Sequence, residues 1–167
     1  SVSNLFAGQF SDSSLVIFSS IPGEISRITL SGETIWISNS EHAAADIITT
    51  PGDSMVYAAL RSFIGFDSDS LLRVDKNGDV TRFREDAFYQ SLASIDSSRF
   101  LGFTQNLDSL VIWSLDDFIP INGVALGGGI RIRDVAVSDA GIAVLTEESG
   151  TYDVLFFNSE LTLQNSF

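Results

Sequence analysis

The turn from Asp75 to Asp79 carries the residues of this sequence best suited to binding a metal ion. Asp75, Asn77 and Asp79 alternate with Lys76 and Gly78, and this Asp-x-Asn-x-Asp spacing places oxygen ligands around Ca²⁺ in calcium loops. The loop lacks the bidentate Glu that completes an EF-hand. The Asn77-Gly78 step is also typical of a tight β-hairpin turn, which explains the same residues without a metal. The three residues are therefore a candidate Ca²⁺ site, with a simple hairpin turn as the competing interpretation.

Two pairs of arginines form the second candidate site. Eight of the nine basic residues are Arg, and two pairs alternate within expected strands: Arg82 with Arg84, and Arg131 with Arg133. Residues i and i+2 of a strand share a face, so each pair forms a cationic spot on an acidic protein. Guanidinium groups suit bidentate binding to carboxylates. We expect these arginines either to contact an acidic surface of another copy or protein, or to pair with acids on a neighbouring sheet.

Residues for nucleophilic or acid–base catalysis are scarce. His42 is the only histidine, Lys76 is the only lysine, and cysteine is absent. A Ser-His-Asp set needs a general base beside its nucleophile, and no serine stands in a nucleophile-elbow sequence. The adjacent acids Asp116-Asp117, Glu147-Glu148 and Glu85-Asp86 point to opposite faces of any strand, which argues against cooperation in glycoside hydrolysis. We therefore expect no catalytic residues and no enzyme activity.

The composition excludes several classes of function. The chain has 167 residues, a formal net charge of −13 and 44% hydrophobic residues. The negative charge disfavours nucleic-acid binding, which needs clustered Lys and Arg. No apolar run approaches the ~20 residues that span a bilayer, and the lack of cysteine excludes disulfides and thiolate metal sites. We expect an acidic globular protein with no nucleic-acid partner and no membrane span.

Short β-strands are the elements expected to position these residues. Apolar, β-branched and aromatic residues alternate with a period of two, which is typical of half-buried strands. Polar steps such as Ser31-Gly32 separate the runs and are typical of turns. The expected strands are Leu15–Phe18, Ile25–Leu30, Thr34–Ile37, Met55–Ala59, Leu71–Val74, Val80–Phe83, Phe100–Phe103, Leu110–Trp113, Val135–Val137, Ile142–Leu145, Val154–Phe157 and Leu161–Leu163. Only Glu41–Ala45 and Glu85–Ser91 offer short helical alternatives.

A repeat of about 43 residues organises these strands. One series of turns starts at Asp12, Gly52, Asp96 and Asp139. A second series starts at Ser31, Asn77, Asp116 and Asn158, with the same average period. Four strands in ~40–45 residues is the size of a β-propeller blade. We predict an all-β, propeller-like array of four four-stranded antiparallel blades in one domain over residues 1–167, with blades near 1–40, 41–86, 87–128 and 129–167. A β-sandwich is the alternative fold.

Several of these units resemble the blades of known propeller families. Asp134–Leu145 with the following Val154–Leu161, and also Leu72–Asp79, resemble NHL-type repeats. Ile28–Trp36 is similar to the end of a quinoprotein-type blade, and Leu110–Asp116 resembles the third strand of a WD repeat, although the Gly-His dipeptide of that repeat is missing. The resemblance covers nearly the whole chain and implies a propeller. Some families with similar blades are lactonases, which implies inward-facing Glu, Asn and Asp from different blades; this sequence shows no recognisable set of that kind.

Protein–protein contact is therefore the expected function. We expect a non-enzymatic, self-associating structural or scaffold subunit of an extracellular assembly, whose partners are copies of itself or other protein subunits. No cofactor is expected unless Ca²⁺ binds at the Asp75 turn. Low Lys and abundant Ser, Gly and Asp are typical of secreted proteins. Two alternatives stay open: a hydrolase-type propeller that uses carboxylates and Ca²⁺, and a section of a larger propeller whose other blades carry the function.

Overall fold

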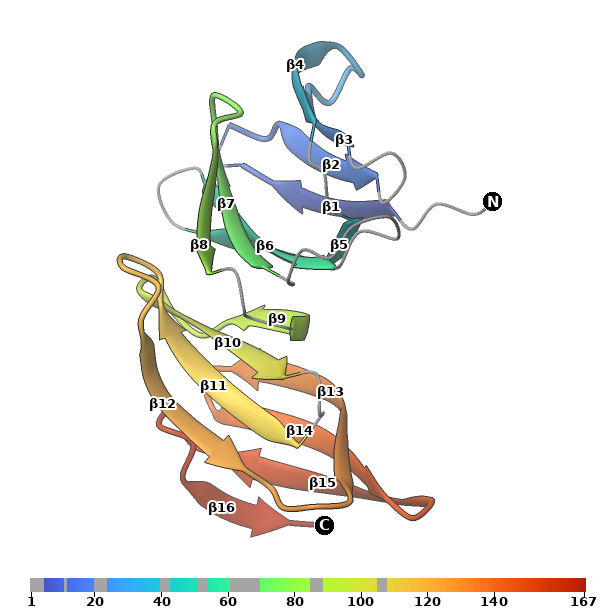
Figure 1. Cartoon of the computed structure of the whole chain (residues 1–167), viewed down its shortest axis with the longest axis vertical. Coiled ribbons are helices and arrows are strands. Elements are labelled where there is room, and N and C mark those ends of the chain that lie inside the picture. Colours follow the sequence, from blue (N-terminus) through green and yellow to red (C-terminus); the bar gives the residue numbers. More distant parts are fainter. Residues whose placement is uncertain are drawn as a thin grey trace. The chain divides into compact units, whose positions relative to one another are not determined.

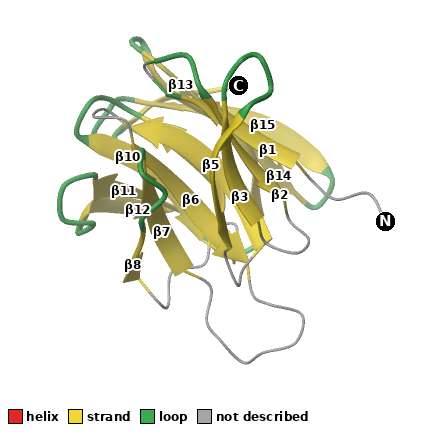
Figure 2. Cartoon of the chain, turned by 90° about the horizontal axis from the view of Figure 1, so that it is seen from above, coloured by secondary structure: helices red, strands yellow, loops and turns green. Residues whose placement is uncertain are grey.

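The described part of the chain is built from β-strands. The computed structural model describes residues 5–10, 12–19, 24–39, 43–50, 54–60, 70–84, 89–104 and 108–167. Within these ranges the regular elements are strands and none is a helix (Figures 1 and 2). No helix in this part of the chain is therefore long and apolar enough to cross a membrane. The prediction of an all-β fold is confirmed.

Sixteen described strands form four sheets of four, which we refer to as blades 1 to 4. Blade 1 contains β1 (Leu5–Gln9), β2 (Leu15–Ser19), β3 (Glu24–Ile28) and β4 (Thr34–Asn39). Blade 2 contains β5 (Ala43–Thr50), β6 (Ser54–Leu60), β7 (Ser70–Asp75) and β8 (Val80–Arg84). Blade 3 contains β9 (Tyr89–Ser94), β10 (Arg99–Thr104), β11 (Ser109–Ser114) and β12 (Pro120–Ala125). Blade 4 contains β13 (Ile130–Ser138), β14 (Gly141–Glu148), β15 (Thr151–Phe157) and β16 (Leu163–Ser166).

Each blade is a simple antiparallel meander, in which sheet order follows sequence order. A repeat of strand, turn and strand produces this topology because every connection joins neighbouring strands. The fold is the predicted propeller-type array of four-stranded blades.

The chain divides into two compact units, Ser1–Tyr89 and Gln90–Phe167, and the boundary falls at the first residue of β9. In the first unit, β1 of blade 1 lies beside β5 of blade 2, and Val16, Ile25, Leu71 and Val74 are completely buried. In the second unit one apolar cluster takes side chains from both of its blades: Leu101, Phe103, Leu110, Ile112, Ile132, Ile142, Val144, Phe157 and Leu161. Removing this apolar surface from water, at about 25 cal/mol per Å², is what holds the two blades of a unit together.

The third and fourth strands of every blade are joined by a turn with one left-handed residue. These residues are Gly32 (φ 86°), Gly78 (φ 91°), Phe118 (φ 55°) and Leu161 (φ 57°). Glycine adopts this conformation without steric cost, whereas a side chain pays about 1–2 kcal/mol. Phe118 and Leu161 are both buried, so burial of a large apolar side chain offsets that cost.

Three local expectations from the sequence were wrong. Ala43–Ala45, a helical alternative, lies in β5, and Tyr89–Ser91 lies in β9; residues 41–42 and 85–88 lie outside the described ranges. Helix propensity is a weak prior that sheet pairing overrides. Leu161, expected to begin a strand, lies in a turn. The fourth strand of the third unit, for which the sequence supplied no bounds, is Pro120–Ala125. Pro120 is its first residue and lies at the edge of the sheet, where its missing N–H removes no ladder bond.

Candidate functional site

Blade 4 has one face buried against blade 3 and a second, outer face. Along β14 the buried residues Ile142, Val144 and Thr146 alternate with less buried neighbours, because successive side chains of a strand point to opposite faces. The outer face of blade 4 therefore includes three register rows beside the pair Ser138 and Gly141. These rows are Arg131, Glu147 and Tyr152; Asp134, Leu145, Val154 and Phe167; and Ala136, Ala143, Phe156 and Asn165.

A hollow of about 120 Å³ opens on this outer face. Its lining consists of small residues and one aromatic ring: Ala136, Val137, Ser138, Ala140, Gly141, Ala143 and Phe156. Phe156 is 39% exposed and Phe167 is 73% exposed, and their rings meet edge to face with centroids 5.8 Å apart. The hollow thus suits an apolar side chain from another surface better than an ion.

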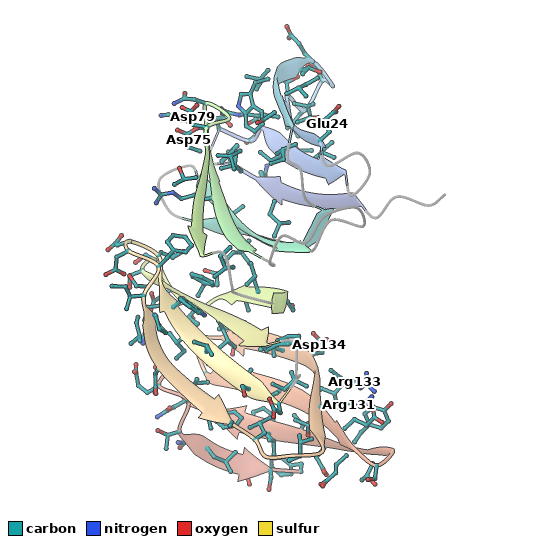
Figure 3. The ribbon with its side chains drawn as sticks, viewed as in Figure 1. Glu24, Asp75, Asp79, Arg131, Arg133 and Asp134 are labelled. Carbon is teal, nitrogen blue, oxygen red and sulfur yellow. The ribbon has the colours of Figure 1, made fainter. Side chains whose placement is uncertain are left out.

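Arg131 and Arg133 lie at one end of β13, as Figure 3 shows. Arg131 is the register partner of Glu147. Arg133 occupies a β-bulge and donates from Nε to Glu147 Oε2 at 2.5 Å, and also from Nη2 to the same oxygen. The acid partner of Arg133 is therefore on its own blade rather than on a neighbouring one. Within the described residues no carboxylate pairs with Arg131, which is exposed.

The other predicted arginines, Arg82 and Arg84, lie in β8, and their side chains are outside the described part of the structure. Their role at an interface stays a prediction.

In the Asp75–Asp79 turn, the carboxylate of Asp75 accepts backbone N–H groups of the same turn. Asp75 Oδ1 accepts the backbone N–H of Asn77 at 2.7 Å and that of Asp79 at 3.0 Å, and Asp75 Oδ2 lies 3.4 Å from Asn77 Nδ2. Figure 3 places Asp75 and Asp79 at the tip of the β7–β8 hairpin. Among the described residues no three His, Cys, Asp or Glu side chains are grouped closely enough to hold a metal. Hydrogen bonds within the turn account for this geometry, and Ca²⁺ binding here stays a prediction.

Hydrogen bonds between blades 1 and 2 involve residues that the sequence did not single out. We call such a set of hydrogen bonds between two blades a joint. The buried Arg27 guanidinium donates to Ser14 Oγ at 2.8 Å and to Asp12 Oδ2 at 2.5 Å, both in the first turn of its own blade. It also donates to the carbonyl of Lys76 in blade 2 at 2.5 Å. Trp36 Nε1 donates to the same carbonyl at 2.8 Å. Hydrogen bonds from Ser14, and then the charge and hydrogen bond of Arg27, hold the pKa of Asp12 below its usual value.

Blades 3 and 4 are joined in the same manner. Arg99 Nε donates to Asp96 Oδ2 at 2.8 Å, in the first turn of blade 3, and Nη1 donates to Glu160 Oε1 of blade 4 at 2.7 Å. Asn122 Nδ2 of β12 donates to the carbonyl of Glu160 at 2.7 Å. Hydrogen bonds from the Ser98 backbone and from Arg99 lower the pKa of Asp96, and the bond to Glu160 raises the pKa of Arg99.

One sequence signal pointed to both joints. The triplet Asp-Ser-Ser occurs at 12–14 and again at 96–98, and in each case the Asp holds the arginine of the joint. The repeat alignment contained these residues, but the arginines come from different strands, β3 and β10, so alignment alone did not reveal the pairing.

Comparisons with known proteins identify the fold and no family. No family model and no curated protein sequence matches the chain. A Bacteroides caccae protein of unknown function matches in structure with a TM-score of 0.64 and 15% identity, over 99% of this chain and 61% of its own. A catalytically inactive variant of virginiamycin B lyase from Staphylococcus aureus, solved with quinupristin, matches with a TM-score of 0.68 and 10% identity, over 98% of this chain and 55% of its own. The chain thus spans 55–61% of these two structures, and at such identities the likeness shows a propeller-type fold alone.

Proposed function

We propose that this chain is a non-enzymatic propeller-type module that acts by protein–protein contact and self-associates through the outer face of blade 4. The observation that carries the proposal is the apolar hollow beside the exposed rings of Phe156 and Phe167. Contiguous exposed apolar patches on soluble proteins mark interaction sites. Tyr152 adds a third aromatic ring to the same face, and aromatic residues are enriched in the centre of protein interfaces.

The described charged side chains support a structural role rather than catalysis. Asp12 and Asp96 each bind the guanidinium of an inter-blade joint, and Asp75 caps its own turn. The single histidine, His42, lies outside the described residues. At 10% identity no residue of the structurally similar lyase is transferred to this chain. The extracellular scaffold role stays a prediction from composition.

A second candidate is that the four blades form part of a longer propeller. The observation in its favour is that the chain spans 61% and 55% of the two structures above. In that case a further blade of the same polypeptide covers the outer face of blade 4. Sequencing the full-length transcript tests this candidate, because additional blade-like repeats support it and a reading frame limited to these four units contradicts it.

Self-association is tested with Phe156→Asp, which places a charge beside the hollow. Analytical ultracentrifugation of the wild type should show a mass that rises with concentration, and the variant should stay monomeric because a buried unpaired carboxylate is costly. The matched control is Ile121→Asp, since Ile121 lies in β12 and is 51% exposed. Circular dichroism establishes that the variants are folded. A wild-type chain that is strictly monomeric at micromolar concentration contradicts the proposal.

A further inference from the structure

We infer that the surface bound by the outer face of blade 4 is the outer face of blade 1 of a second copy, joined as blades are joined within each unit. This inference rests on the proposed self-association and adds its partner surface. Three observations carry it: the position of Asn165, the open turn at Gly32, and the apolar character of blade 1.

Asn165 occupies the position from which the two observed joints are made. In β4, Trp36 pairs with Arg27 next to a β-bulge, and in β12, Asn122 pairs with Ile112 next to a β-bulge. Both donate from the side chain to a carbonyl in the third turn of the following blade. In β16, Asn165 pairs with Phe156 next to the corresponding bulge. Asn165 is exposed, and its unit contains no following blade.

In blade 1 the corresponding acceptor is the turn between β3 and β4. No donor from another blade reaches this turn among the described residues. In blade 2 the ring of Trp36 lies 3.0 Å from the point where a Cβ on Gly78 would be, so the preceding blade packs directly on that glycine. Gly32 is the equivalent residue of blade 1, with a similar φ, and nothing lies within 4 Å of its Cβ position. The Thr29 and Glu33 carbonyls accept backbone N–H groups within this turn. The carbonyl of Leu30, which occupies the position of Lys76, has no donor among the described residues and can accept a bond of the same kind.

Blade 1 also presents an apolar outer face. Ile25 and Arg27 are buried on its inner side. Ser26 lies between them in β3 and therefore points outward, together with its cross-strand partners Ile17 and Ile37. Ile37 is 58% exposed, and Ile35 and Leu30 are exposed near the open turn. A hollow of about 330 Å³ lies beside this turn. The outer face of blade 1 therefore offers apolar side chains to the ring of Phe156 and a turn to Asn165.

The two surfaces offer one pairing of opposite charge, between an arginine of blade 4 and the acids of blade 1. The same face of blade 4 also carries Asp134, and Glu147, which Arg133 binds. Blade 4 contributes Arg131, which has no carboxylate partner among the described residues, and blade 1 contributes Glu24 and Glu33. Figure 3 shows Glu24 and Arg131 as labelled side chains of their blades. Complementary charge at the rim of an interface raises the association rate and disfavours wrong pairings.

A mixing experiment tests the pairing of blade 4 with blade 1. Phe156→Asp disables the blade 4 face and Ile37→Asp disables the blade 1 face, so each variant alone should be monomeric. Mixed in equal amounts, they keep one intact face each and should form a 1:1 complex that is weaker than the wild-type assembly. Ultracentrifugation with one variant fluorescently labelled measures this complex.

The outcomes separate the inference from the proposed function. If Ile37→Asp still self-associates while Phe156→Asp does not, blade 4 binds another surface and the inference is wrong, but the proposed function stands. If both variants are monomeric alone and remain so when mixed, the inference is overturned. If the wild type itself is monomeric, both proposals fail.

Asn165→Asp tests the hydrogen bond without disturbing the apolar face. The change replaces a donor with a charged acceptor facing a carbonyl, and we expect self-association to weaken about tenfold. Gln164→Glu is the control, because it makes the same change of charge at the neighbouring exposed residue of β16. Equal effects of the two substitutions contradict a specific bond from Asn165.

Discussion

Arg27 and Arg99 place guanidinium groups where two blades of a unit meet. Arg27 is only 8% exposed, and burying an unpaired charge costs several kcal/mol. Arg27 donates hydrogen bonds to the Ser14 hydroxyl, the Asp12 carboxylate and the Lys76 carbonyl. Its guanidinium carbon lies 4.7 Å from the centroid of the Phe10 ring. The arginine thus replaces its hydration shell with fixed partners, and the same contacts define how the blades stack.

Acid should weaken the joint between blades 3 and 4. The pKa of Asp96 is below its ordinary 3.8 in the folded chain, so the folded chain binds fewer protons there than the unfolded chain. Its contribution to stability is present above pH 3.8 and is lost as the pH falls through the lowered pKa. We expect the unfolding temperature to drop in this range, and the drop to be smaller in Asp96→Asn.

Thermal unfolding followed by circular dichroism at a series of acidic pH values measures this effect. Asp116→Asn is the control, because Asp116 is exposed in the turn between β11 and β12. A pH profile of Asp96→Asn that parallels the wild type contradicts the prediction.

The turn between the third and fourth strands has the same left-handed conformation in every blade, but the residue that adopts it differs between blades. Its left-handed residue is glycine in blades 1 and 2 and a buried apolar residue in blades 3 and 4. In blade 2 the glycine is required for a close approach, since the Trp36 ring fills the place of its side chain. One backbone conformation therefore serves two different ways of packing.

Alanine at Gly78 and at Gly32 should have unequal effects on stability. Both substitutions force a side chain into positive φ, at a cost of about 1–2 kcal/mol. Gly78→Ala adds a contact of 3.0 Å with Trp36, and overpacking of this kind costs about 1 kcal/mol or more in addition. Urea unfolding at low protein concentration measures the difference. Equal losses of free energy would show that Trp36 moves aside without cost.

At the scale of the whole molecule, the outer face of blade 4 and the outer face of blade 1 have properties that complement each other. Contacts that use different surfaces on the two partners form either closed rings or open filaments. Two copies joined through blades 4 and 1 contain eight blades, which lies within the range of ~4–8 found in propellers.

Association should therefore stop at two copies. Sedimentation equilibrium at increasing concentration should reach a plateau at twice the chain mass of 18.1 kDa. Ile37→Asp disrupts the blade 1 surface, so the mass of this variant should stay at that of one chain. Continued growth of the mass with concentration contradicts ring closure and indicates open, filament-like association.

Much of the fold was predictable because its signals are local. The period-two pattern of β14 and the turn residues around Gly78 act over a few neighbours, so they specify strands and hairpins without knowledge of the rest. The failures were also local: Ala43–Ala45 satisfied a helical preference that pairing with β6 overrides. Leu161 continued an apolar pattern but was needed in a left-handed turn.

The amino-acid sequence by itself determined the strands, their repeat and the alternation of faces, since each depends on the spacing of residue types along the chain. Only the tertiary structure decided which faces are covered and which side chains meet between blades. Arg27 and Lys76 are 49 residues apart, and Arg99 and Glu160 are 61 apart. A period of two shows that a strand has an apolar face, but burial depends on the neighbouring blade. For that reason the exposed face of Phe156 and the open turn at Gly32 became visible only in three dimensions.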